Sequence, residues 1–171
     1  METLHRMAKH LPGRRLLGQL PPDADRLDID AIGTVWVMED PLLITLKGHL
    51  IIEAALADIC TRLLANPPAL ERDRMGFVAR LNLVCALLDP GYLPDSIVQS
   101  LRDLNRIRNS LAHNLEPGDL NENLEKFFQR FDEFEDFRTL REEDRTVAKR
   151  LAACIAFLCG VLGDIGAQEE P

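Results

Sequence analysis

Aromatic residues are scarce in this chain of 171 residues: they make up 5% of it, as seven Phe, one Trp and one Tyr. Basic residues are also outnumbered, with 20 Lys and Arg against 28 Asp and Glu, so the net charge is -8. This balance argues against a protein that binds nucleic acid through overall basicity, but it leaves room for a local basic site. The chain also lacks a glycine-rich phosphate loop, a G-x-S-x-G motif and a dinucleotide fingerprint.

Signals of disulfide bonding, secretion and membrane insertion are missing as well. The cysteines form no C-x-x-C pair and lie in apolar runs, which indicates small buried side chains rather than disulfides or a zinc site. The N-terminus has no uninterrupted apolar segment of a secretory signal. The longest apolar run, 151–162, is shorter than the roughly 20 residues that a membrane helix needs. We therefore expect a cytoplasmic protein with no metal, no cofactor and no membrane association.

The first forty residues differ from the rest. Pro12-Gly13 and Pro21-Pro22 interrupt any periodic pattern, and an acidic stretch follows, so residues 1–40 are predicted to be an irregular N-terminal segment. Residues 31–38 are compatible with a short extended piece or with an early helical turn, because periodicity does not decide between them.

Residues 41–171 are predicted to form an all-α helical bundle of about five helices. Asp40 followed by Pro41 is typical of a helix start, and Asn66-Pro67-Pro68 and Asp89-Pro90-Gly91 are typical of helix ends. No pair of strands and no repeat is recognisable. The expected helices cover 41–64, 74–88, 94–116, a segment that begins at a capping box of Asp119 and Glu122, and 144–165.

The fourth of these helices carries four of the seven phenylalanines. A stripe of phenylalanines at helical spacing could stack on bases, but such a stripe is much more often the core face of a helix. We therefore predict that it is buried. Its members are Leu124, Phe127, Phe128, Phe131 and Phe134.

The third helix contains an anomaly. On a helical wheel its apolar residues share one arc, and Arg108 lies inside that arc, whereas Arg102, Asn109 and His113 fall on the polar side with Arg106 close by. A guanidinium on an apolar face must find hydrogen-bond acceptors or leave its donors unpaired, which is costly. The apolar arc consists of Ile97, Leu101, Leu104, Ile107, Leu111 and Leu115.

The first helix offers a partner for this arginine. His49 and Glu53 are four residues apart and lie at the edge of an arc formed by Leu42, Leu46, Leu56, Ile59 and Cys60. The sequence therefore predicts that Glu53 pairs with Arg108, within one subunit or across a dimer interface. The alternative is that such a pair only fixes helix register. His49 is expected to be a core or supporting histidine rather than a metal ligand, because no second cluster of ligating residues has suitable spacing.

The segment RNSLAH, with Arg108, Asn109 and His113, resembles the R-x(4-6)-H motif of the HEPN superfamily. The surrounding helices, which contain GHLIIEAALADIC, GFVARLNLVCALL and PDSIVQSLRDLNRIRNSLAHNL, resemble the mannitol operon repressor-like branch of these proteins. The resemblance covers roughly residues 41–117. It implies a helical bundle that forms a homodimer, with the two motif-bearing helices facing each other across a cleft.

Many HEPN proteins are metal-independent ribonucleases of toxin or defence type, so the resemblance implies an RNA substrate and an antitoxin or regulatory protein as partner. His113 would move a proton of the RNA, Arg108 would hold the phosphate and Asn109 would orient either group. Arg102 and Arg106 would attract the phosphate backbone. Arg108 and His113 lie about 140° apart on an ideal helix, so their joint action needs the long arginine reach, a distorted helix or a partner subunit.

Two other interpretations stay open. The protein could be a non-enzymatic regulatory or interaction module of the mannitol repressor-like kind, in which the motif forms a network at the dimer interface. The match of the motif could also be a coincidence in an unrelated helical protein.

Overall fold

The computed structural model of the chain describes residues 29–69, 75–113, 120–132, 134, 137 and 146–168. Within these ranges the regular structure is helical and no strand occurs, which confirms the predicted all-α bundle. The described residues contain six α-helices and one short 3-10 helix. They are α3 (Ile29–Val37), α4 (Pro41–Leu63), η2 (Pro67–Ala69), α5 (Phe77–Leu87), α6 (Asp95–His113), α7 (Leu120–Gln129) and α9 (Val147–Gln168).

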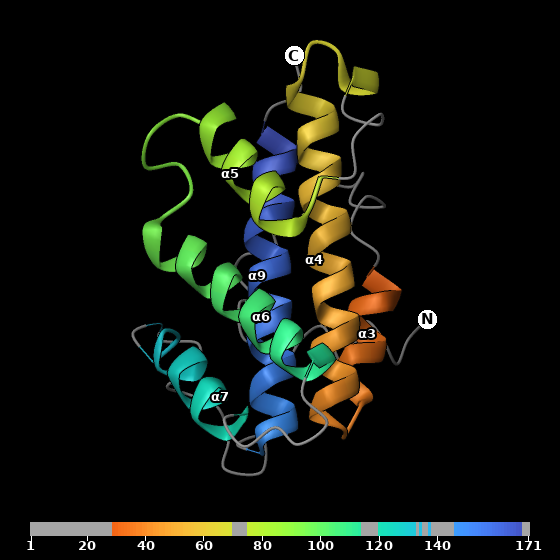
Figure 1. The fold of residues 1–171 in the computed structure, drawn as a ribbon, viewed down its shortest axis with the longest axis vertical. Coiled ribbons are helices and arrows are strands. Elements are labelled where there is room, and N and C mark those ends of the chain that lie inside the picture. Colours follow the sequence, from red (N-terminus) through yellow and green to blue (C-terminus); the bar gives the residue numbers. More distant parts are fainter. Residues whose placement is uncertain are drawn as a thin grey trace.

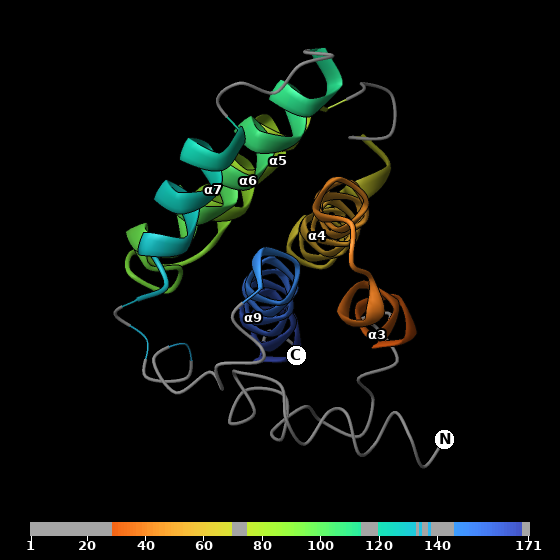
Figure 2. The same ribbon diagram turned by 90° about the horizontal axis from the view of Figure 1, so that it is seen from below.

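The helices are arranged around a central pair. The two longest helices, α4 and α9, run side by side along the long axis of the molecule (Figure 1). Seen along this axis, α5, α6 and α7 form a layer on one side of the pair, and α3 packs on α4 and α9 at the other side (Figure 2). This arrangement places α6, which carries the motif, against α4 and α7.

The helix α4 begins where the sequence predicts. The Asp40 side chain accepts a hydrogen bond of 2.8 Å from the backbone N–H of Leu42, and Pro41 occupies the first turn, where its missing N–H costs nothing. The buried face of α4 differs from the predicted arc, because Leu42 is exposed and Ile44, Gly48 and Ile52 are buried instead. The prediction was wrong for Leu42 because the buried face of α4 is set by its contacts with both α9 and α6, which the pattern of α4 alone does not reveal.

The helix α9 is the centre of the core. Every residue from Leu151 to Gly160 is buried, as expected for a helix that is apolar on all sides. Cys154 and Cys159 lie in this stretch, and burial raises the pKa of Cys159 to about 12. All four cysteines are free thiols, in agreement with the prediction that they are not paired. None of the described helices has the length and apolar character that crossing a membrane requires.

Residues 29–37 form a helix, so the predicted irregular segment does not extend to residue 40. Two side chains of α3, Ile32 and Val35, are buried in the main core. The ammonium of Lys149 in α9 donates a 2.7 Å hydrogen bond to the carbonyl of Trp36 and lies 5.3 Å from the centre of its ring. A cation at the carboxyl end of a helix is stabilising, and here it fixes α3 to the start of α9. The sequence pattern left this segment open because its burial depends on α9.

The phenylalanine stripe is buried, as predicted. Phe127, Phe128 and Phe131 are each at most 1% exposed, and Phe134 is partly buried against the same core. The helix is shorter than expected, however: α7 ends at Gln129, and Phe131 belongs to the turn that follows. The stripe is thus a packing surface towards α9 rather than a surface for bases.

Candidate functional site

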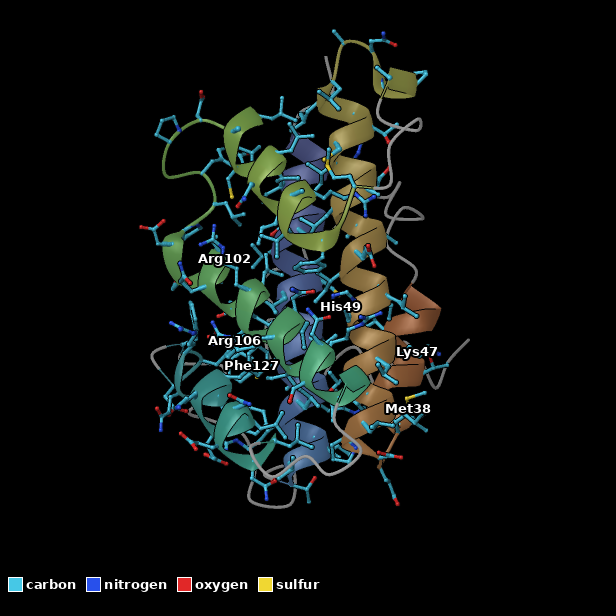
Figure 3. All side chains as sticks on the ribbon, in the orientation of Figure 1. Met38, Lys47, His49, Arg102, Arg106 and Phe127 are labelled. Carbon is cyan, nitrogen blue, oxygen red and sulfur yellow. The ribbon has the colours of Figure 1, made fainter. Side chains whose placement is uncertain are left out.

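A buried histidine lies at the contact between α4 and α6. His49 is only 3% exposed, and its Nε2 lies 3.0 Å from Oδ1 of Asn105 on α6. Its ring stacks on that of Phe77 with 4.5 Å between the ring centres. Figure 3 shows the side chain in the region where α6 crosses α4. His49 is therefore a core residue that joins three helices.

The contacts of His49 define its protonation state. Because Oδ1 of Asn105 accepts, Nε2 carries the proton, and Nδ1 is the bare nitrogen. Nδ1 has no hydrogen-bond partner among the described residues and lies 3.9 Å from Oε2 of Glu53. Burial lowers the pKa of His49 below 6.5, and the positive charge of Arg108 acts in the same direction, while Asn105 and Glu53 oppose the shift. The ring is accordingly neutral at pH 7.

This lowered pKa predicts a pH dependence of stability. Between the unfolded pKa of about 6.5 and the lower folded pKa, the unfolded chain binds a proton that the folded chain does not. The free energy of unfolding should therefore decrease as the pH falls below about 6.5. Urea unfolding of the wild type and of His49→Gln at a series of pH values measures this: the variant should show a flatter profile between about pH 7 and 5.5. An identical slope in both proteins would refute the assignment.

The prediction that Glu53 pairs with Arg108 is wrong within one subunit. Oε1 of Glu53 lies 3.3 Å from Nη1 of Arg80, which belongs to α5, and Glu53 also faces His49. Arg108 instead donates a 3.1 Å hydrogen bond to the Asn109 side chain. The reason is that α5 packs on α4 beside Glu53, and a helical wheel of α6 contains no information about this neighbour. Since Glu53 is one-third exposed, its pair with Arg80 adds little to stability.

The motif residues lie on one helix. Arg108 and Asn109 are partly buried and joined by their own hydrogen bond, and α6 continues to His113 at its end. The side chain of His113 lies outside the described residues, so the predicted approach of this imidazole to Arg108 is not tested. Arg108 is close enough to His49 to lower its pKa, and it is half-buried rather than buried. The motif thus begins next to the His49 contact.

The two other arginines of α6 lie in different surroundings (Figure 3). Arg102 donates a 2.9 Å hydrogen bond to Oδ1 of Asn82 on α5. Arg106 is 67% exposed, and its Nη1 lies 2.8 Å from Oδ1 of Asp103. The carboxylate of Asp103 is buried and also binds Arg130, the residue that follows α7. Arg102 therefore belongs to the contact with α5, whereas Arg106 pairs with Asp103 on its own helix. The three arginines thus have different hydrogen-bond partners, which are Asn82, Asp103 and Asn109.

The sequence pattern missed Asn105, Arg80 and Asp103. Asn105 could have been found, because it lies three residues before Arg108 on the same side of the helix and is a second polar residue there. Arg80 is the single charged residue of α5, which is a signal as well. Asp103 had no signal, since its burial depends on α7, which covers another face of α6.

Neither a metal site nor a similar known protein indicates what the residues of α4 and α6 described above do. No group of three or more His, Cys, Asp or Glu side chains in the described part of the chain could hold a metal ion. Comparisons of the chain with protein-family models, with curated proteins and with solved structures gave no match. The likeness to HEPN proteins therefore depends on the motif and the helix pattern alone.

Proposed function

We propose that this protein is a HEPN-like, RNA-directed protein that cleaves RNA without a metal ion, as a toxin or defence effector does. The observation that carries the proposal is the continuity of α6: Arg108, Asn109 and His113 lie on one unbroken helix, and the Asn109 amide holds the Arg108 guanidinium. An arginine has five N–H donors, so one bond to Asn109 leaves others for an anion.

The chemistry needs only these side chains and the RNA itself. The 2′-oxygen attacks the adjacent phosphorus, the bond from phosphorus to the 5′-oxygen breaks, and a 2′,3′-cyclic phosphate and a 5′-hydroxyl result. His113 takes the proton of the 2′-hydroxyl or delivers one to the leaving 5′-oxygen, since an imidazole titrates near neutral pH. Arg108 neutralises the charge that develops on the phosphate oxygens.

A second copy of the chain is part of the proposal. Residues five apart on a helix diverge by about 140°, so Arg108 and His113 of one subunit do not point in the same direction. Two α6 helices that face each other would place His113 of the partner subunit beside Arg108. Exposed Arg106 lies two residues before Arg108 and would contact the RNA backbone, although Asp103 offsets part of its charge.

The test is cleavage by the purified full-length chain. RNA incubated with the protein and EDTA should be cut and should carry 2′,3′-cyclic phosphate ends. Arg108→Ala and His113→Ala should each lower the rate about 100-fold or more, because each removes a group that acts on the transition state. Lys126→Ala is a matched control, since this exposed residue of α7 pairs only with Glu122 in the described structure. Expression of the wild type, but of neither motif variant, should halt bacterial growth.

Mixing the two inactive variants tests the dimer. If each site combines Arg108 of one subunit with His113 of the other, a mixture of Arg108→Ala and His113→Ala protein should regain part of the activity, because mixed dimers contain one intact site. Absence of recovery, with dimers confirmed by light scattering, would show that each subunit contains a complete site. Uncut RNA together with unchanged growth would refute the ribonuclease.

The alternative is a non-enzymatic regulatory module, and one observation favours it. His49 pairs with Asn105 and Glu53 pairs with Arg80, so these side chains join α4 to α6 and α5, as contacts do that serve packing alone. In that case a protein partner, rather than RNA, would bind near α6. The growth experiment separates the two functions, since a regulatory module would not depend on His113 for toxicity.

A further inference from the structure

A cavity of about 290 Å³ lies between α5 and the start of α6, away from the motif. The connection between the two helices closes one side of it, where Gly91 adopts a positive φ of 87° that favours glycine. Its apolar wall is formed by buried leucine and valine side chains. These are Leu88, Leu93 and Val98.

Arg102 supplies a cation to this cavity. Its terminal nitrogen is fixed by the 2.9 Å hydrogen bond to Asn82, so the guanidinium is held in one orientation. Its Nε–H is buried and has no hydrogen-bond partner among the described residues. Since this Nε–H is closed off from solvent, an anion in the cavity would accept from the outer N–H groups of the guanidinium, which has five donors in all. Arg102 is thus prepared to hold an anionic group.

The same cavity also has acidic walls. Asp89 and Asp95 line it, and the thiol of Cys85 lies near enough to feel the charges of both Arg102 and Asp95. One guanidinium and two carboxylates give the lining a formal charge of -1. A phosphate dianion or an RNA backbone would be repelled by the carboxylates. A molecule that carries one anionic and one cationic group matches both signs of charge in the lining.

We propose that this cavity binds a small zwitterion of the α-amino acid type. Its carboxylate would accept from the outer N–H groups of Arg102 and its ammonium would donate to Asp95 or Asp89, while an apolar side chain would lie against Leu88 and Val98. The cavity is near the lower end of the range of roughly 300–1,000 Å³ for ligand pockets, which suits a molecule of this size. The site is independent of the proposed ribonuclease function and assigns Arg102 to a small ligand instead of RNA.

The experiment uses the full-length protein and the free standard amino acids as probes. Each is added at millimolar concentration, and the thermal midpoint and the NMR signal of Arg102 Nε–H are recorded. At least one amino acid should bind saturably and shift that signal. Arg102→Gln and Asp95→Asn should each weaken its binding about tenfold or more, because each removes a charged hydrogen bond. Lys126→Gln on α7 is the control and should bind as the wild type does.

Derivatives of the best amino acid identify the chemistry. Its N-acetyl form lacks the ammonium and its amide lacks the carboxylate, so both should bind much more weakly than the parent. Equal binding of the N-acetyl form, or of inorganic phosphate, would replace the proposal with a simple anion site and overturn it. Absence of binding by every amino acid would overturn it too, as would unchanged affinity in Arg102→Gln protein that circular dichroism shows to be folded.

Discussion

Replacing Phe131 with alanine is expected to lower the free energy of unfolding by about 3–5 kcal/mol. The ring is 1% exposed and lies at the centre of an aromatic cluster. The ring centres of Phe127, Phe137 and Phe157 are 5.1, 5.0 and 5.9 Å from it. Truncation removes these contacts and leaves a cavity between the end of α7 and α9 that backbone movement can fill only in part. Chemical denaturation monitored by circular dichroism measures the change.

A second variant at position 131 tests whether the buried volume of the phenylalanine ring accounts for the loss of stability. Phe131→Leu keeps most of the buried volume and should cost less than the alanine variant, about 1.5 kcal/mol. If the ring were instead a stacking surface for bases, Phe131→Ala would weaken RNA binding and leave the unfolding transition in place. That result would contradict the assignment of the stripe to the core.

Replacing Gly48 with alanine is expected to destabilise the protein, although alanine favours helices by about 1 kcal/mol over glycine. A Cβ atom at this position would lie 2.3 Å from Cδ1 of Ile155 and 2.9 Å from its Cγ1 and Cγ2. Because Ile155 is fully buried in α9, its whole side chain would have to move, or α4 and α9 would have to separate. Overpacking of this kind costs about 1–3 kcal/mol, so the net change should be a loss.

A double-mutant cycle identifies the cause. Ile155→Ala alone should destabilise by about 2–5 kcal/mol, because it leaves a cavity. In Gly48→Ala combined with Ile155→Ala the clash is absent, and the double variant should be more stable than the sum of the single changes predicts. Additive losses would show that Gly48 is needed for a reason other than its contact with Ile155. The unfolding free energies of the four proteins from urea titration complete the cycle.

Local signals made much of the fold predictable. Asp40 and Pro41 define the start of α4, and Asp89-Pro90-Gly91 follows α5, because caps and turns depend on adjacent residues. The burial of Phe127 and Phe128 followed from their spacing alone. In contrast, α3 was left undecided because its packing depends on α9, far along the chain.

The sequence indicated individual residues of the site but not which of them are partners. The wheel of α6 indicated an arginine in need of an acceptor, but the choice among acceptors depends on which helix lies beside which. Glu53 lies next to α5 and binds Arg80, so Arg108 bonds to its own neighbour Asn109. His49 was expected to be a core residue, and it is one, but its partner Asn105 required knowledge of how α4 and α6 cross.

The pairing of α4 with α9 affects synthesis of the chain. Residues 64–146 separate the two helices, so the ribosome releases α4 well before its main partner exists. During that interval Ile44, Ile52 and Leu56 lack their final cover, and such apolar surface on a nascent chain attracts chaperones and other unfinished chains. The contact between Lys149 and Trp36 likewise cannot form until the start of α9 has been synthesised. The core therefore closes only when α9 joins α3 and α4, and a chain that stops before α9 is expected to aggregate rather than to form a smaller folded protein.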